Sequence, residues 1–454
     1  MRTLAVKPNG DVVAAGDFQS IGGVQASNIA LRDAGGWRAL GSGVDGIVTD
    51  VAIMANGDLV VVGGFQNAGG NPAQGVARWD GSTWSPLGAG IGTPYGANCV
   101  EVGANGHVYV GGFFQSGGTY AYLGEWDGAT WSYVPCNSIV HGLARLPNGD
   151  LVAAGGFTSV GGAAANYVAR FDGSSWQPMG AGFSSFALRV AVTGDGTPYV
   201  LGSFAQAEGQ IVNGIARWDG AHWHGVGGGV LPNYSSVLAA MTLPGGDLIV
   251  GGSFDTAGGV AAPRLARWNG TAWSAFGSPD SWVSAMAMQP DGSVLLAGNF
   301  VRIGGIASAY LAGLTSTCAA SAASLGGGCP SSGGNNDLVA TALPWVGSTF
   351  RAQATGVPTS GFVVAVTGFL PAAVPLASVL PQGVAGCDLL TTADITQLVF
   401  ASGGIAHSAL PLPNAAVLAG FPLRHQLVPC ELGSGGSLAA VTSSNVLALS
   451  IGSF

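Results

Sequence analysis

The sequence contains very little charge. Only 8% of its 454 residues are charged, against about 25% in ordinary soluble proteins. Lys7 is the single lysine, glutamate occurs four times, and the formal net charge is -9. Nucleic-acid binding needs clustered Lys and Arg side chains, so this balance argues against it. The shortage of Glu and Lys, two strong helix formers, makes long amphipathic helices improbable.

The sequence also lacks an apolar run long enough to cross a membrane. Residues 352–387 carry no charge, but four prolines interrupt them: Pro358, Pro371, Pro375 and Pro381. A spanning helix needs about 20 consecutive apolar residues, so no membrane span is predicted. Residues 1–8 hold too short an apolar core for a signal peptide. We expect an upstream export segment to be missing from this chain.

Glycine is abundant, with 78 residues, and it belongs to a repeat. A Gly-x-Phe tripeptide ends at Phe18, Phe65, Phe113, Phe157, Phe204, Phe254 and Phe300. The spacings are 47, 48, 44, 47, 50 and 46 residues, and each Phe is followed five residues later by a glycine. The first six units also carry a tryptophan, at Trp37, Trp84, Trp131, Trp176, Trp223 and Trp273. Because they recur, we expect these tryptophans to pack between neighbouring units.

Each unit is typical of four short strands. In the second unit the turns Asn56-Gly57 and Asp80-Gly81 each separate two apolar runs. Such dipeptides are strong hairpin signals, because type I′ turns need positive φ. Four strands at a period of about 45 residues indicate a β-propeller blade. The prediction is an all-β chain with a seven-bladed β-propeller over residues 1–314.

The second unit also carries a family resemblance. Gly63-Gly64 after an apolar strand, followed by Arg78-Trp79-Asp80-Gly81 and Trp84, resembles the kelch repeat of galactose-oxidase-type propellers. It is equally similar to glycine-rich propeller repeats of bacterial exported proteins and of fungal cell-surface cortical markers. The resemblance covers about residues 1–314 and implies the fold. It implies little about function, because such propellers include binding proteins and enzymes.

Loop lengths indicate which propeller face could bind a ligand. Tight turns join the first to the second strand and the third to the fourth, so the longer connections share the opposite face, here called the long-loop face. Variable loops on a rigid scaffold commonly carry binding sites, and aromatic rings beside polar groups suit a sugar. The candidate ligand-binding residues are Tyr95, Phe183, Phe186, Glu208, Tyr234 and Trp282. The alternative is that these rings cover the inner strands and bind nothing.

Signals for metal or cofactor chemistry are weak. His222 and His224 alternate on one strand, as metal ligands could, but no third ligand is identifiable nearby, so they are expected to be surface residues. The resemblance to galactose oxidase implies a copper held by tyrosines and histidines, which cannot be placed in this chain. No metal and no cofactor is therefore predicted. The long loops hold few acids besides Glu208, namely Asp45 and Asp280, which disfavours an enzyme.

A change of composition follows residue 314. Residues 315–336 are rich in Gly, Ser and Ala and are expected to form a flexible linker. Residues 337–454 show no 47-residue period and are predicted to form a small β-sandwich-like domain. The expected strands are Phe350–Ala354, Phe362–Val366, Leu398–Ala401 and Val446–Ile451. The domain is similar to C-terminal domains of large exported bacterial proteins.

Six cysteines indicate maturation outside the cytoplasm. The pairs suggested by proximity are Cys318 with Cys329, Cys387 with Cys430, and Cys99 with Cys136. Six cysteines allow fifteen connectivities, and free buried thiols remain the alternative.

These observations favour a non-catalytic propeller, secreted or displayed on the cell surface, that binds a glycan or a protein through the long-loop face. The alternatives are a polysaccharide-acting hydrolase or lyase and a purely structural surface-layer module. The seventh unit has no tryptophan and no evident fourth strand. We therefore expect a three-stranded seventh blade, with the missing strand lying upstream of residue 1.

Overall fold

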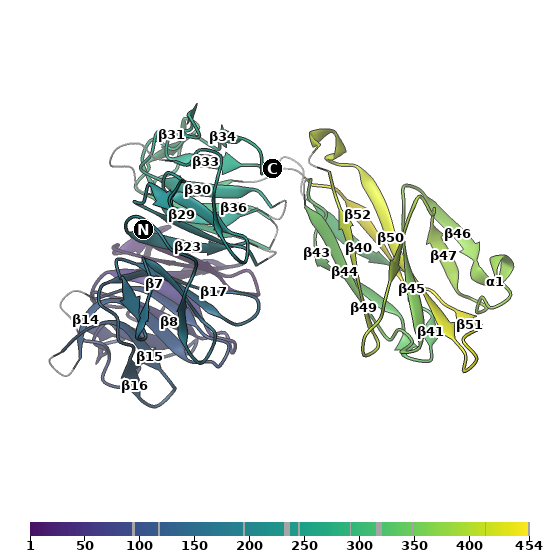
Figure 1. Ribbon diagram of the computed structural model, residues 1–454, viewed down its shortest axis with the longest axis horizontal. Coiled ribbons are helices and arrows are strands. Elements are labelled where there is room, and N and C mark those ends of the chain that lie inside the picture. The colour runs from purple at the N-terminus through teal and green to yellow at the C-terminus, as the bar shows by residue number, and fades with distance from the viewer. Residues whose placement is uncertain are drawn as a thin grey trace. The chain divides into compact units, whose positions relative to one another are not determined.

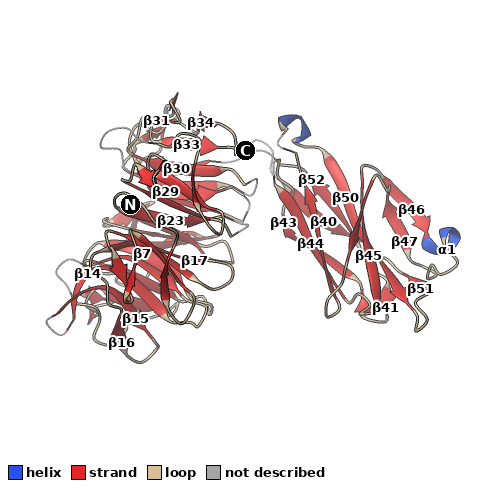
Figure 2. Ribbon diagram, in the orientation of Figure 1, coloured by secondary structure: helices blue, strands red, loops and turns tan. Residues whose placement is uncertain are grey.

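The computed structural model describes residues 1–92, 96–116, 119–193, 196–230, 237–243, 246–290, 292–314, 320–346, 348–413 and 415–452. The chain divides into two compact units. The first unit comprises residues 1–243 and 247–314, and the second consists mainly of residues 315–454. Strands dominate both units (Figure 2). The described residues form a single short α-helix, α1 (Leu376–Val379), and one 3-10 turn, η1 (Ala416–Leu418).

In its described residues, the first unit forms seven antiparallel sheets of three or four strands, numbered 1 to 7 in chain order. Their first, inner strands are β1 (Thr3–Val6), β7 (Val48–Ile53), β13 (Ala97–Val102), β17 (Val140–Arg145), β23 (Ala187–Val192), β29 (Val237–Thr242) and β35 (Val283–Met288). The second strands are β2 (Val12–Ala15), β8 (Leu59–Gly63), β14 (Val108–Ser116), β18 (Leu151–Gly155), β24 (Pro198–Gly202), β30 (Leu248–Gly252) and β36 (Val294–Gly298). The third strands are β5 (Ile29–Asp33), β11 (Val76–Trp79), β15 (Thr119–Trp126), β21 (Val168–Phe171), β27 (Ile215–Trp218), β33 (Leu265–Trp268) and β39 (Leu311–Leu314). The fourth strands are β6 (Gly36–Ala39), β12 (Trp84–Pro86), β16 (Trp131–Tyr133), β22 (Trp176–Pro178), β28 (Trp223–Gly225) and β34 (Trp273–Ala275).

The inner strands form a closed ring. Each contacts the inner strand of the next sheet, and β1 contacts both β7 and β35. The interior of this ring is an axial cavity, which is described below.

The repeated aromatic residues hold neighbouring sheets together. Phe65, Phe157, Phe204, Phe254 and Phe300 are at most 1% exposed. In sheet 3 a register shift between β14 and β15 places Phe114, rather than the expected Phe113, in the core. The indole Nε1–H of Trp84 donates to the carbonyl oxygen of Leu40, at the end of sheet 1, over 2.7 Å. The predicted packing of this tryptophan between units is confirmed.

The connection from second to third strand contains a small hairpin in every sheet except sheet 3. The hairpins are β3 (Ser20–Ile21) with β4 (Val24–Gln25), β9 (Asn67–Ala68) with β10 (Asn71–Pro72), β19 (Ser159–Val160) with β20 (Ala163–Ala164), β25 (Gln206–Ala207) with β26 (Gln210–Ile211), β31 (Thr256–Ala257) with β32 (Val260–Ala261), and β37 (Arg302–Ile303) with β38 (Ile306–Ala307). Five of them turn on a Gly-Gly pair such as Gly258-Gly259, whose φ angles of 56° and 80° few side chains adopt. These recurring glycines are therefore turn residues.

Sheet 7 has three strands in the described residues, in the order β35, β36, β39. The three-stranded seventh sheet predicted from the missing tryptophan is confirmed for this part of the chain. The outer side of β39 has no strand partner among the described residues.

The second unit contains two larger sheets that share one core (Figure 1). One contains β40 (Ser321–Leu325), β45 (Gly361–Gly368), β48 (Ile395–Val399), β50 (Pro422–Leu432), β51 (Leu438–Val441) and β52 (Val446–Ser450). The other contains β43 (Asp337–Ala342), β44 (Thr349–Thr355) and β49 (Ile405–Pro411). Two small pairs are β41 (Pro330–Ser331) with β42 (Gly334–Asn335) and β46 (Pro371–Pro375) with β47 (Asp388–Thr391). Phe350, Leu427 and Leu447 lie in the shared core.

The predicted linker over residues 315–336 is wrong for its described part. Residues 321–325 form β40, which pairs antiparallel with β52, and residues 330–335 form the β41–β42 hairpin. Ser and Ala favour a linker by composition, but the backbone of a short edge strand can pair whatever its side chains are. Residues 315–319 lie outside the described part of the chain.

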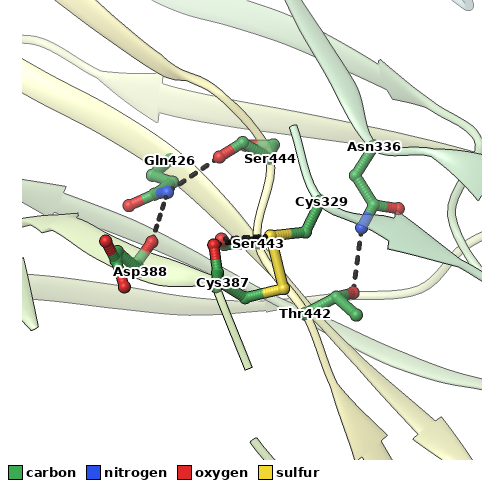
Figure 3. The surroundings of a disulfide bond; sticks show 9 residues. Cys329, Asn336, Cys387, Asp388, Gln426, Thr442, Ser443 and Ser444 are labelled. Carbon is green, nitrogen blue, oxygen red and sulfur yellow. Dashed lines mark hydrogen bonds between the residues drawn. A yellow bond between two sulfur atoms is a disulfide. The ribbon is translucent and has the colours of Figure 1, made fainter. Parts of the chain in front are cut away.

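The disulfide pairs expected from proximity are also wrong. Cys329 is bonded to Cys387, 58 residues away (Figure 3). Cys430 is a free, buried thiol in the same core cluster. Cys99 and Cys136 are free as well, so they do not form the expected third pair. Cys329 lies immediately before β41 and Cys387 immediately before β47. Cys318 lies outside the described residues.

No helix in the described residues is long and apolar enough to span a membrane.

Candidate functional site

The inner strands share a backbone irregularity at the end where they enter the ring. In six sheets a β-bulge interrupts the pairing of the inner strand with the second strand. The extra residues are Thr49, Asn98, His141, Leu188, Leu238 and Ser284. Arg2 occupies the corresponding place in sheet 1, where its backbone N–H donates to the Ala15 carbonyl. Bulges commonly redirect side chains at the rims of barrels and next to functional sites.

These seven residues, here called the bulge ring, all line a cavity of about 570 Å³ at the mouth of the axis. The same cavity touches Asp17, Trp282 and Asn299, which come from connections of the long-loop face. A second cavity of about 310 Å³ shares most of the bulge ring and extends along the inner strands. The long-loop face therefore leads directly into the axis.

Asp50 follows the bulge of sheet 2 and joins three sheets. Its carboxylate accepts hydrogen bonds from Thr3 Oγ1 in sheet 1, from its neighbour Val51 N–H, and from Val100 N–H in sheet 3. Desolvation in the cavity wall raises the pKa of Asp50, and the hydrogen bonds and Arg189 oppose this only in part. Asp50 is thus a half-buried acceptor in the wall of the cavity.

Arg189 is the counterpart of Asp50 in sheet 5. Its guanidinium donates to the carbonyl oxygens of His141 in sheet 4, Leu188 in its own sheet and Leu238 in sheet 6, over 3.0 to 3.1 Å. Asp50 and Arg189 occupy the same register position, one residue after the bulge. Each side chain bonds to both neighbouring sheets. Asp50 therefore links sheets 1 to 3, and Arg189 links sheets 4 to 6.

Two further titratable groups line the deeper cavity. Burial raises the pKa of Glu101 to about 7, with Asp50 adding to the shift. Burial and the nearby Arg189 lower the pKa of His141, whose Nδ1 lies 3.4 Å from Asn98 Nδ2. Glu101 can therefore hold or release a proton near neutral pH.

Glu101→Gln should alter how stability depends on pH. The raised pKa means that the unfolded chain releases this proton first, near its ordinary value of 4.5. The stability that Glu101 contributes is complete below that pH and is lost as the pH rises through about 7. Glutamine does not titrate, so the variant should not show this loss. The difference in melting temperature, variant minus wild type, should therefore increase from about pH 5 to about pH 8, measured by circular dichroism. A difference that stays the same at both pH values would contradict the raised pKa.

The predicted ligand-binding residues are dispersed. Trp282 is 47% exposed and lines the cavity mouth. Phe186 holds the corresponding position in sheet 5. The N–H of Ser203, just after the second strand of sheet 5, donates to the Phe186 carbonyl, as the N–H of Asn299 in sheet 7 donates to the Trp282 carbonyl. Phe186 is 52% exposed, packs against Tyr167, and is not among the residues that line the cavity.

Phe183 is a core residue, and its assignment to a ligand site is wrong. It is 5% exposed and stacks on Phe204, with ring centroids 4.1 Å apart. It lies seven residues after Trp176, and Val44, Ile91 and Val230 are buried at the same distance from their own tryptophans. This repeat spacing was present in the sequence and could have identified Phe183 as scaffold.

Glu208 also has a structural role. It replaces the first turn glycine in the hairpin of sheet 5 and has a φ of 48°. Its carboxylate accepts from the backbone N–H of Ala181 and of Trp223 and lies 3.1 Å from His222 Nδ1. These bonds satisfy the carboxylate within the scaffold.

The remaining candidates contribute less. Tyr95 and Tyr234 lie outside the described residues. The exposed His222 and His224 pair with different carboxylates, those of Glu208 and Asp219. No group of three or more His, Cys, Asp or Glu side chains suited to a metal ion occurs among the described residues.

Comparison with known proteins supports the fold. A family model described as a domain of unknown function, DUF5122, beta-propeller, matches residues 146–174 and 289–316. Both segments run from the turn before the second strand to just beyond the third, in sheets 4 and 7. None of the curated proteins matches the chain. The chain is a β-propeller protein.

Several solved structures are similar to the chain at low identity. One, described as a candidate gluconolactonase, is 11% identical, with 65% of this chain and 84% of that chain covered and a TM-score of 0.32. The extracellular domain of a candidate one-component system from B. thetaiotaomicron is 8% identical, with 100% and 73% covered and a TM-score of 0.26. The extracellular domain of a candidate hybrid two-component system from B. thetaiotaomicron is also 8% identical, with 100% and 74% covered and a TM-score of 0.23.

Proposed function

We propose that this chain is a non-catalytic, seven-bladed propeller of the kelch type, with a β-sandwich-like C-terminal domain, that binds a glycan at the axial mouth of its long-loop face. The observation that carries the proposal is the exposed Trp282 beside the polar side chains of the bulge ring. An aromatic ring that stacks on the apolar face of a sugar, next to hydrogen-bonding groups for its hydroxyls, is a common arrangement for carbohydrate recognition.

The groups at the mouth match a sugar better than an ion. Asn98 and Asn299 offer amide groups that can donate and accept, and the Ser284 hydroxyl, which donates to the carbonyls of Met1 and Ala297, can still accept. Arg2 and Asp17 at the rim carry opposite charges, so they do not give the mouth a net charge. Neutral, two-sided hydrogen-bonding groups suit hydroxyls, which are both donors and acceptors.

We place the protein outside the cytoplasm, secreted or on the cell surface. The Cys329–Cys387 disulfide supports this location, because disulfides persist in oxidising compartments and are rare in the cytosol.

Trp282→Ala should weaken glycan binding. The variant removes the ring that stacks on the sugar and leaves the bulge ring in place, so we expect affinity to fall by at least about tenfold, or roughly 1.4 kcal/mol. A glycan array identifies the ligand, and titration calorimetry with it compares the variants. Phe186→Ala is the matched control, because Phe186 is equally exposed at the corresponding position but does not line the cavity. A wild-type protein that binds no glycan would instead favour a structural surface-layer module.

An enzyme is the second candidate. Asp50, Glu101 and His141 converge on one cavity, and Glu101 has the near-neutral pKa that suits a general acid or base. A polysaccharide-acting hydrolase or lyase would lose turnover in Glu101→Gln while it still bound its glycan. Absence of product from every glycan that the protein binds would dismiss this candidate.

A further inference from the structure

Sheet 7 lacks a structural element that sheets 1 to 6 all possess. Their fourth strands pair with the third strand and bring a tryptophan to the same place. In sheet 6, for instance, Trp273 lies opposite Trp268 and Ala275 opposite Ala266. In sheet 7 the third strand is β39, which corresponds to β33 of sheet 6. Leu314 pairs with Val294 of the second strand as Trp268 pairs with Leu248, so Leu314 is equivalent to Trp268. The position opposite Leu314 is where the missing tryptophan would lie.

Among the described residues, nothing fills the place of that tryptophan. In sheets 1, 2, 4 and 6 the first glycine of the hairpin turn packs against the tryptophan of the fourth strand. A Cβ atom added at Gly22 would lie 2.4 Å from Trp37, and one at Gly258 would lie 2.5 Å from Trp273. Gly304 has the same φ as Gly258, 56°, yet a Cβ there would meet nothing within 4 Å. The turn of sheet 7 is thus shaped for a ring that the described residues do not supply.

Two hydrogen-bonding groups flank this space without a partner. In sheets 2, 3, 5 and 6 the indole N–H donates to the carbonyl three residues after the tryptophan of the preceding sheet, as Trp273 does to Val226 over 3.2 Å. By this rule a tryptophan in sheet 7 would donate to the Phe276 carbonyl, and Trp37 of sheet 1 would donate to the missing strand. Within the described residues, Phe276 O and Trp37 Nε1 have no hydrogen-bond partner. One strand would satisfy both groups.

Apolar surface is also uncovered at this edge. In the other five sheets with a hairpin, the fourth strand contacts the second strand of that hairpin. Ile306 of β38, where that cover is absent, is 75% exposed, whereas the equivalent Val260 is 44% exposed. In the part of the chain that the structure describes, the edge therefore combines unpaired backbone, a turn glycine with no neighbour against it and an exposed apolar side chain.

We propose that this edge is a binding site for an extended segment of another polypeptide that carries the pattern Trp-x-x-(Leu, Val, Met or Phe). The segment adds to sheet 7 as its fourth strand, antiparallel to β39, with its tryptophan opposite Leu314 and against Gly304. Strand addition of this kind gains affinity from backbone hydrogen bonds and specificity from the side-chain pocket. The pattern is that of the chain's own fourth strands, as in Trp84-Ser85-Pro86-Leu87 and Trp273-Ser274-Ala275-Phe276.

A second copy of the chain is a poorer occupant. The segments of residues 1–454 that show the pattern begin at Trp37, Trp84, Trp131, Trp176, Trp223 and Trp273, and each of them already forms or borders a fourth strand. A second copy would have to unpair one of its own sheets to supply the segment.

A synthetic peptide tests the proposal. The probe is a fluorescently labelled copy of residues 270–277, titrated with the 454-residue chain and followed by anisotropy. We expect saturable binding, and at least tenfold weaker binding of the same peptide with Trp273→Ala. In the protein, Gly304→Asn should weaken binding to the same degree by filling the space, since Asn tolerates positive φ better than other side chains. Gly305→Asn is the matched control, because Gly305 also has positive φ but a Cβ at this turn position meets nothing in any of the six hairpins.

Three outcomes would overturn the proposal. The first is no binding of the probe at millimolar concentration. The second is equal binding of the Trp273→Ala peptide, or equal loss in the Gly304→Asn and Gly305→Asn proteins. The third is a dimer in light scattering that Gly304→Asn dissociates and the probe does not, which would assign the edge to a second copy. The peptide comparison keeps the test valid even if a protein variant misfolds.

Discussion

Phe254→Ala should lower the free energy of unfolding by about 3–5 kcal/mol, the range for truncating a buried phenylalanine. Phe254 is fully buried in the cluster that joins sheets 5 and 6, where it contributes with Val250 and Trp273 to one core. Close packing lets the neighbours relax only partly, so the lost ring leaves a cavity. Urea denaturation followed by tryptophan fluorescence measures the effect.

Phe186→Ala is the control for this measurement. The Phe186 ring is 52% exposed, so its removal should change stability far less than the removal of Phe254. Similar losses in the two variants would mean that the repeated phenylalanine does not hold the sheets together.

The double variant Cys329→Ser, Cys387→Ser should destabilise the second unit by about 2–4 kcal/mol, because the bond closes a long loop and restricts the unfolded chain. The loop spans 58 residues and ties the β41–β42 hairpin to the segment before β47. The described first unit contains only free cysteines, so its transition should stay where it is. Differential scanning calorimetry resolves the transitions of the two units.

Cys136→Ser is the control for the double variant, since Cys136 is a free thiol of the first unit. Alkylation of the unfolded, unreduced protein followed by mass spectrometry should label Cys99, Cys136 and Cys430 but neither Cys329 nor Cys387. Labelling of Cys329 together with protection of Cys430 would contradict the observed pairing.

The arrangement of strands could be predicted because the residues needed for turns and for packing between sheets recur in every repeat or nearly every repeat. Gly-x-Phe, the turn glycines and the tryptophans each recur at the spacing that packing between sheets demands. The second unit offered no such redundancy. Its longest strand, β50, contains Pro422 and Pro429 and was not predicted, because proline suggests a break unless its position in the sheet is known. The disulfide failed for a related reason, since pairing depends on which strands become neighbours.

The candidate site was predicted only in part. Trp282 departs from the repeat and was found for that reason. Asp50, Glu101 and Arg189 were missed because they lie within strands, while the search for function concentrated on loops. Their signal was present in the sequence, as charged residues inside short and otherwise largely apolar inner strands. Only the bulges decide which of these side chains face the axis, and bulges leave no motif in a sequence.

The bulge ring separates what the molecule needs in order to fold from what it can recognise. Arg, Thr, Asn, His, Leu and Ser all occupy the same backbone position around the axis, so that position accepts side chains that differ in size, charge and polarity. The phenylalanines and tryptophans that bear the packing lie elsewhere in each sheet. A single substitution in the ring can therefore exchange one chemical group at the mouth while the scaffold stays intact. Combinations of substitutions at the seven positions would give many different surfaces. Divergence of ligand preference among proteins built on this plan should accumulate at these positions first.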